Sequence, residues 1–154
     1  MRSFNFDVRA MFDLNQVFKD IEEILRENIV YNLFSEIAKK VQWPYQILLA
    51  KFINNLRENY EPLRVLVEEK NVEPKILAEY ISYVIKLAEK YELELVSLNM
   101  NLFKDVEIPN WIEVVLIIKV RSPNIDKIFN YWSEISKNKK GSLKALAVEV
   151  EPVE

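Results

Sequence analysis

The sequence has no histidine, no cysteine and a single glycine, and each absence removes a class of function. Without His and Cys, the chain lacks the usual ligands of zinc, copper, haem and iron-sulfur centres, and it cannot form Ser-His-Asp or Cys-His catalytic sites. The one glycine, Gly141, cannot supply a GxGxxG or Walker loop, because these loops need several glycines beside the phosphates. We therefore expect no cofactor and no metal site, and any chemistry would have to use carboxylate, lysine, tyrosine or serine side chains.

Long apolar runs and a strong excess of one charge are also missing. No uninterrupted apolar stretch approaches the ~20 residues of a membrane span, and the N-terminal residues lack the apolar core of a signal peptide. The formal net charge is −3 and neither half of the chain is basic, which disfavours general nucleic-acid binding. We expect a cytoplasmic protein with no membrane partner. Abundant Lys and Glu without Cys favour a thermophilic source, although abundant Asn argues against it.

Four segments have the apolar pattern of β-strands. Residues 3–9 alternate apolar and polar side chains, as in a strand with one buried face. The other predicted strands span 92–103, 111–121 and 143–150. In the segment 92–103 the apolar register shifts, which a β-bulge near Val96 and Ser97 would reconcile. The segment 111–121 is apolar on both faces, which predicts a central strand.

The remaining segments have helical periodicity. A long helical stretch is predicted from residue 13 to 41, and further helices are predicted to start near Pro44, Pro62 and Pro74. The apolar stripe of the long stretch consists of Leu14, Val17, Phe18, Ile21, Leu25, Leu33, Ile37 and Val41. The helix over 75–90 is apolar around most of its circumference, which predicts cover on two sides. The helix after Pro123 is predicted to bury Ile125, Ile128, Phe129, Trp132 and Ile135.

This order of elements predicts a fold. Strand, helices, strand, strand, helix and strand give the βαββαβ plan of a ferredoxin-like α+β sandwich with an antiparallel four-stranded sheet. Right-handed crossovers would place the strands in the order four, one, three, two. Residues 1–154 would form a single domain, in which residues 13–73 are an enlarged helical insertion. That insertion would form an outer helical layer or a dimerisation arm.

The predicted sheet has one face that its helices do not cover, and this face is the candidate binding surface. Its residues are Asn5, Asp7, Arg9, Asn99, Asn101, Trp111, Glu113, Val115, Ile117, Lys119 and Arg121. The surface combines polar edges with an apolar strip on the third predicted strand. A protein interface, cover by the protein's own helices, and a small-molecule ligand are the alternatives. RNA binding is disfavoured, because the first strand offers Asn5 and Asp7 where exposed aromatics would be needed.

Several short motifs have a functional and an ordinary structural interpretation. The lysines around Gly141, at positions 137, 139, 140 and 144, could hold a phosphate, but lysines and a glycine also suit the end of a helix. Ser136 and Lys139 match SxxK without the other elements of a serine-lysine acylase. Acidic clusters occur at Asp20, Glu22 and Glu23 and at Glu68, Glu69 and Glu73. Neighbouring basic residues make these clusters typical of solvated helix faces.

Three functional hypotheses follow from these residues. The first is a non-enzymatic interaction module that forms a homodimer or joins another protein through the free sheet face or the helical arm, with Trp111 as a candidate anchor. The second is a small-metabolite sensor with a pocket near Asn99, Asn101 and Arg121. The third is an enzyme that uses Asp7, Arg9 and Lys119 in one cleft. No family resemblance supports one hypothesis over another.

Overall fold

Helices come first along the described chain. The structure is a computed structural model that describes residues 8–41, 45–108 and 110–154. Helix α1 spans Val8–Lys40, α2 spans Gln46–Glu58, and α3 spans Glu61–Arg64. A π-helical turn at Val65–Glu69 follows α3, and α4 spans Pro74–Lys90. Prolines stand in the first turns of α3 and α4, where the absence of a backbone N–H costs nothing.

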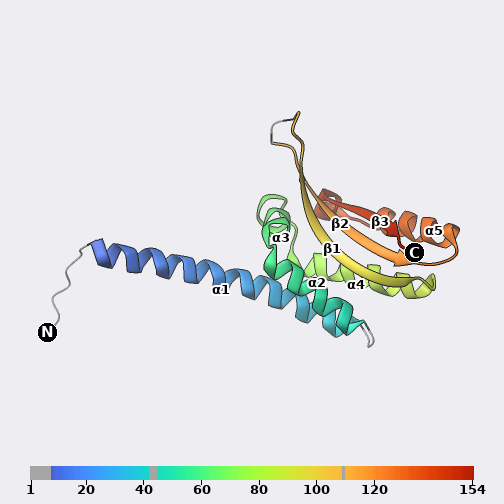
Figure 1. Ribbon diagram of the computed structural model, residues 1–154, viewed down its shortest axis with the longest axis horizontal. Helices are drawn as coiled ribbons and strands as arrows, with labels where there is room; N and C mark the ends of the chain where they lie inside the picture. Colours follow the sequence, from blue (N-terminus) through green and yellow to red (C-terminus); the bar gives the residue numbers. More distant parts are fainter. Residues whose placement is uncertain (1–7, 42–44, 109) are drawn as a thin grey trace.

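A three-stranded mixed sheet follows these helices (Figure 1). Strands β1 (Glu94–Lys104) and β2 (Ile112–Arg121) are antiparallel, and β3 (Leu146–Pro152) runs parallel to β2. Helix α5 (Ile125–Lys137) and a 3₁₀ turn (Gly141–Ala145) connect β2 to β3. The order β1-β2-β3 makes β2 central, as its two apolar faces predicted. The predicted bulge is also confirmed, because the β1–β2 register shifts between Leu95 and Ser97.

The ferredoxin-like prediction is wrong, although the α+β class is confirmed. The described helices α1 to α4 precede the sheet, and the sheet has three strands among the described residues. Strands β2 and β3 pair directly, with Val114 opposite Leu146, where the predicted order required another strand between them. Of the predicted strand 3–9, residues 8 and 9 belong to α1 and residues 3–7 lie outside the described residues. The alternation over residues 3–9 did not show that Val8 and Arg9 begin a helix.

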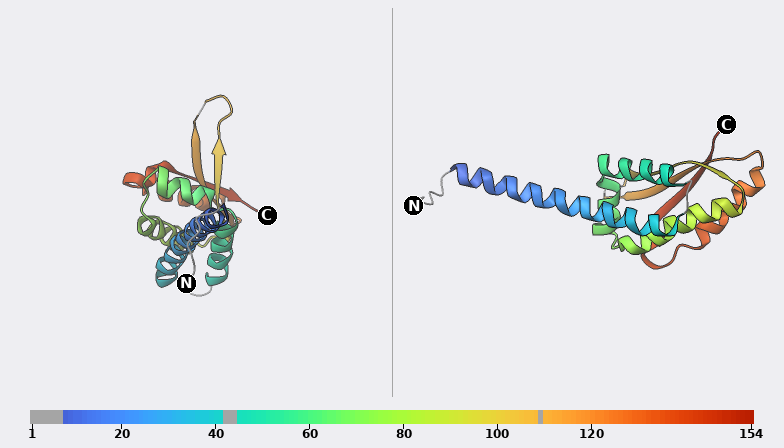
Figure 2. Two further views of the ribbon diagram at one scale, coloured as in Figure 1. Left: turned by 90° about the vertical axis from the view of Figure 1, so that its left-hand side faces the viewer. Right: turned by 90° about the horizontal axis from the view of Figure 1, so that it is seen from below.

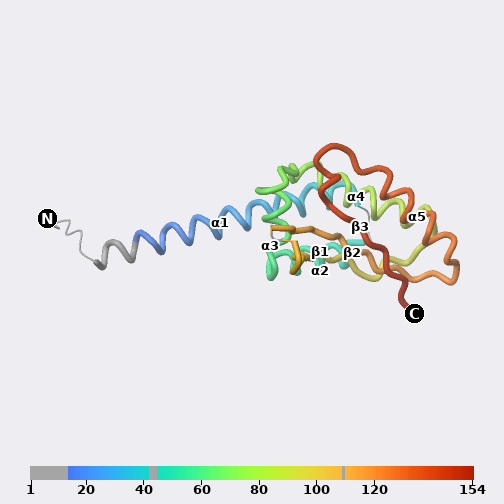
Figure 3. The backbone as a smooth tube through the Cα atoms, turned by 90° about the horizontal axis from the view of Figure 1, so that it is seen from above, coloured from blue at the N-terminus to red at the C-terminus, as the bar shows by residue number. Residues whose placement is uncertain are grey.

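The core lies between the sheet and the helices. The inward side chains of β2, Val114, Leu116, Ile118 and Val120, are fully buried and belong to one core with α4 and α5. Figure 3 shows α4 and α5 on one side of the strands and α2 beside β1. Helix α4 is buried on most of its circumference, as its sequence predicted, because α1 packs against it as well.

Tyrosine hydroxyl groups join α4 to α5 inside this core. The hydroxyl of Tyr131 donates to the carbonyl of Val84 at 2.8 Å, and the hydroxyl of Tyr80 donates to the carbonyl of Ile135 at 2.7 Å. Burial raises the pKa of both phenols, so both stay neutral donors at physiological pH. The two bonds run in opposite directions between the helices and fix their relative position.

The buried stripe of α5 differs from the predicted one. Ile128 and Ile135 are buried as predicted, but the third buried side chain is Tyr131. Ile125 and Phe129 are exposed, and Trp132 is 40% exposed. The predicted stripe was too wide because it was based on apolar residues alone. It included Phe129 and Trp132 and left out Tyr131, whose ring can be buried because its hydroxyl donates a hydrogen bond inside the core.

Side chains cover part of the outer edge of β3. The Nζ of Lys139 donates to the carbonyl of Leu146 at 2.7 Å, and the Nε1 of Trp132 donates to the carbonyl of Val148 at 3.3 Å. Pro152 ends the strand without an N–H group. Side-chain partners and proline are devices that limit pairing of an edge strand with another chain. The β3 edge is therefore a poor place for sheet extension.

Helix α1 belongs to the body of the protein over only part of its length. With 33 residues at ~1.5 Å per residue, it is roughly 50 Å long. Its C-terminal half packs against α2 and α4, and its N-terminal half projects away from the other elements (Figures 1 and 2). No glycine or proline interrupts residues 8–40, which allows one continuous helix.

Candidate interaction surface

The projecting half of α1 exposes a continuous apolar face, which we call the arm face. It consists of Leu14, Val17, Phe18, Ile21, Ile24 and Leu25, whose side chains are 46–58% exposed. Their spacing places them on one side of the helix, about 120° wide at 3.6 residues per turn. Apolar surface of this width on a helix is normally buried against another element. The arm face is therefore the strongest candidate for an interaction surface among the described residues.

The arm face points away from the body of the protein. The C-terminal half of α1 buries a different stripe, Val30, Leu33, Ile37 and Val41, at 0–5% exposure. At ~100° per residue, Ile21 and Ile37 point about 160° apart around the helix. A straight α1 therefore cannot lay its arm face on the surface that its C-terminal half covers. The protein's own α2 and α4 therefore do not cover the arm face, which is exposed in the structure.

Polar contacts fix the direction of the arm where it leaves the body. The guanidinium of Arg57 in α2 is paired with the carboxylate of Glu27 at 2.9 Å. The guanidinium of Arg26 lies over the ring of Tyr60 at 4.7 Å, a cation–π contact. Both contacts join α1 to the segment around α2 and α3, so the arm begins N-terminal to Arg26.

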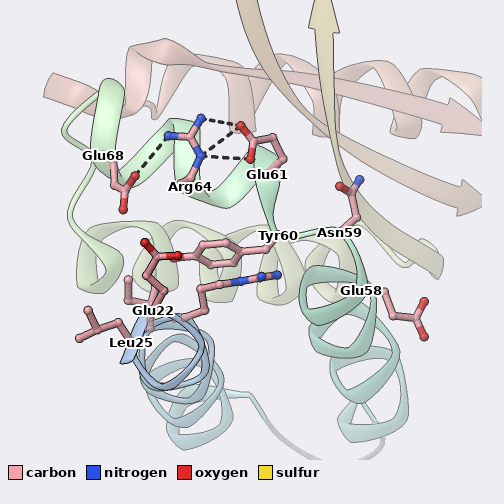
Figure 4. Close-up of a pocket in the computed structure, with 10 residues that line it drawn as sticks. Glu22, Leu25, Glu58, Asn59, Tyr60, Glu61, Arg64 and Glu68 are labelled. Carbon is pink, nitrogen blue, oxygen red and sulfur yellow. Dashed lines mark hydrogen bonds and ion pairs between the residues drawn. The ribbon is translucent and has the colours of Figure 1, made fainter. Parts of the chain in front are cut away.

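A cavity of about 530 Å³ lies beside this junction (Figure 4). Its charged lining consists of Glu22, Arg26, Glu58, Glu61, Arg64 and Glu68. The guanidinium of Arg64 already forms two ion pairs, one with Glu61 and one with Glu68 at 3.2 Å. Hydrogen bonding to Arg64 lowers the pKa of Glu61, and burial raises the pKa of Tyr60. The lining keeps an excess of carboxylates, and the Arg64 pairs lie within α3 and the turn that follows it. Among the described residues, the contact of Arg26 with Tyr60 joins this segment to the base of the arm.

The polar side of the arm is acidic. Between residues 14 and 28 it carries the carboxylates of Asp20, Glu22, Glu23 and Glu27 against the cations of Lys19 and Arg26. Helices that lie on anionic membranes carry Lys and Arg on their polar face, so this charge disfavours a membrane partner. The acidic clusters singled out in the sequence do not assemble into a metal site, since the described residues contain no group of three or more acidic side chains placed to hold an ion.

The structure brings together only part of the predicted sheet-face surface. Asn5 and Asp7 lie outside the described residues, and Arg9 belongs to α1 rather than to a strand. The remaining strand residues do share one region of the sheet, because β1 and β2 pair Asn99 with Ile117, Asn101 with Val115, and Glu113 with Phe103. Trp111 lies just before β2 and is 52% exposed.

Two polar groups of this sheet face, Asn99 and Arg121, already have side-chain partners. The Nδ2 of Asn55 in α2 donates to the Oδ1 of Asn99 at 2.7 Å, so α2 reaches this face. Arg121 pairs with Glu94 at 3.1 Å across the strands. Val115 is buried, and Ile117 and Lys119 are half-buried. The face is less apolar than the arm face, because it contains Asn99, Asn101, Glu113, Lys119 and Arg121. Arg9 lies on α1 and not on a strand beside Lys119, which removes the arrangement that the enzyme hypothesis assumed.

Two other groups of exposed apolar side chains occur among the described residues, and only Trp111 of these was part of the surface predicted from the sequence. The tip of the β1–β2 hairpin exposes Phe103, Val106, Ile108 and Trp111, and α5 exposes Ile125 and Phe129. Each group is smaller than the arm face.

The lysine-rich turn also differs from a phosphate site, because Lys139 is directed to the carbonyl of Leu146 and its pKa is lowered by burial.

The fold and this surface define a small α+β protein with a projecting helical arm. Comparison of the chain with protein-family models, with curated proteins and with solved structures finds no match. Within residues 8–41, 45–108 and 110–154, every helix is too short or too polar to span a lipid bilayer.

Proposed function

We propose that this chain is a non-enzymatic protein-protein interaction module and that the arm face is its docking surface. The observation that carries the proposal is the set of six large apolar side chains, each about half exposed, on a helix that projects from a well-packed body. In known peptide and helix recognition, anchors at i, i+3, i+4 and i+7 enter an apolar groove or pack against another helix. Leu14, Val17, Phe18 and Ile21 have this spacing.

The energetics of the arm support a bound state. Fully burying a large apolar side chain is worth about 1.5–3 kcal/mol, so completing the burial of six half-exposed side chains offers several kcal/mol. The arm lacks packing against the rest of the chain, because residues 14–28 are all exposed. Most helical stability in proteins comes from packing of an amphipathic face, so the unpartnered arm is less stable than the packed half of α1. Docking would therefore stabilise the arm helix and remove apolar surface from water in the same step.

The arm face is a better docking surface than the open sheet face for two reasons. The sheet face is partly closed by α2 through the Asn55–Asn99 bond, whereas the arm face is directed away from the body. Its contacts would also be mainly apolar, and the gain from burial grows with the apolar area removed from water.

Site-specific photo-crosslinking tests this proposal. With p-benzoylphenylalanine in place of Phe18 on the arm face, we expect a discrete cross-linked product with a defined protein, either another copy or a second species. The same group in place of Glu23, on the opposite side of the helix, serves as the matched control, and Asn101→p-benzoylphenylalanine tests the sheet face. Products from position 101 with none from position 18, in purified protein and in extract of the source cells, would contradict the proposal.

A further inference from the structure

We infer that the partner of the arm face is a second copy of this chain and that two α1 helices pair antiparallel, arm against arm. This inference rests on the proposed function and names its partner. It draws on three features of the described residues: a heptad spacing along the arm, an apolar groove at one end of that spacing, and a charge beside the groove.

The apolar side chains of the arm follow a seven-residue repeat. Leu14, Val17, Ile21 and Ile24 occupy the first and fourth positions of two successive heptads. The next two positions of the same series are Asn28 and Tyr31, and both are exposed. The seam from Leu14 to Tyr31 is thus about 26 Å long, and its last two positions lie on the part of α1 that the body holds. A continuous heptad seam is typical of a helix that pairs with another helix.

The seam ends at a groove that could receive the tip of a second arm. A cavity of about 250 Å³ between α1 and α2 is lined by Val30, Tyr31, Phe34, Ala50, Ile53, Asn54 and Arg57. Most of these side chains are apolar, and Tyr31 itself is 64% exposed. If two seams run antiparallel with Ile21 opposite Ile24, then Leu14 of each copy lies opposite Tyr31 of the other. The arm tip of each copy then reaches the groove of the other.

Charge supports the same orientation. In an antiparallel pair, the flank of α1 that carries Asp20 and Glu27 faces the same flank of the second copy. Two acidic flanks alone would repel each other. Arg57, however, already sits beside Glu27 at 2.9 Å and is half exposed, so it can also meet Asp20 of the second copy. The body thus supplies the positive charge that the arm flank lacks.

Disulfide trapping tests this arrangement, because the chain has no cysteine of its own. Chains with Leu14→Cys and chains with Tyr31→Cys would be mixed under reducing conditions, oxidised, and separated on a non-reducing gel. Antiparallel pairing places these two positions opposite each other, within reach of a disulfide, which needs Cα atoms about 4.4–6.8 Å apart. We expect a covalent dimer in the mixture that is lost when either variant is oxidised alone. Glu23→Cys, on the opposite side of the helix, should give none.

Two results would overturn the inference. A covalent dimer from Leu14→Cys alone would show a parallel pair, and a wild-type chain that stays monomeric in native mass spectrometry would exclude the second copy as the partner. In the latter case, a cross-link from position 18 to a different protein would leave the proposed function intact, so the two failures are distinguishable.

Discussion

Replacing Phe18 and Ile21 together by lysine is expected to separate the paired arms and leave a folded monomer. Both side chains lie on the arm face at 57% and 46% exposure, so their replacement removes little from the core of the single chain. Hot-spot anchors cost about 2 kcal/mol or more each when lost, and each dimer would lose four. Because such losses are not additive, we expect about half of their sum of roughly 8 kcal/mol, which raises the dissociation constant about 1,000-fold. Sedimentation velocity over a range of concentrations would measure this shift.

A matched control separates the arm face from a general effect of charge. The variant Gln16→Lys with Glu23→Lys places two lysines on the opposite side of the same helix turns. Both variants introduce two lysines, which are good helix formers, so a difference between the variants would not come from helix propensity. The prediction is contradicted if the control dissociates as readily as Phe18→Lys with Ile21→Lys, or if the arm-face variant keeps the mass and affinity of the wild type.

Replacing Tyr131 by alanine is expected to give the largest loss of stability of a single substitution in α5. The ring is fully buried, and its hydroxyl donates to the carbonyl of Val84. Its centroid lies 6.3 Å from that of the Tyr91 ring in an edge-to-face arrangement. Large aromatic-to-alanine changes in a core cost about 3–5 kcal/mol, which is a large part of the stability of a small domain. Urea unfolding followed by circular dichroism, at one fixed protein concentration, would measure the free energy of unfolding.

Two further variants separate the contributions of Tyr131. Tyr131→Phe keeps the ring and removes the hydroxyl, which leaves the Val84 carbonyl without this donor and should cost about 1–3 kcal/mol. Phe129→Ala removes an aromatic ring of the same size as the Tyr131 ring from the exposed side of the same helix. It should change the free energy of unfolding by about 1 kcal/mol or less. An equal loss from Phe129→Ala and Tyr131→Ala would show that the described burial of α5 is wrong.

Elements with strong periodicity could be predicted from the sequence. The central strand β2 was recognisable because both of its faces are apolar, and the bulge in β1 because its apolar register shifts by one residue at Val96 and Ser97. The topology could not be predicted in the same way. Direct pairing of β2 and β3 is a contact between segments far apart in the sequence, and the local alternation at Phe4, Phe6 and Val8 carries no information about it.

The sequence predicted the candidate surface only in part. The stripe Leu14, Val17, Phe18, Ile21 and Leu25 was recognised as the apolar side of a helix, and a dimerisation arm was one interpretation of that segment. Periodicity shows that a helix has an apolar face, but it does not show what covers it. A helix that packs along its whole length on one body keeps its apolar residues on one side. In this sequence Ile21 and Ile37 point about 160° apart around the helix, which was the available signal that the two halves of α1 have different surroundings.

Hydrogen exchange at residues 14–25, measured as a function of protein concentration, tests the docking role of the arm face most directly. A helical arm without a partner opens readily, and a paired one is protected by its contacts. We predict that protection of these amides increases with concentration, while the amides of α4 stay equally protected at every concentration. Protection that is absent throughout, or that is the same at all concentrations and in the variant Phe18→Lys with Ile21→Lys, would contradict the pairing of two arms.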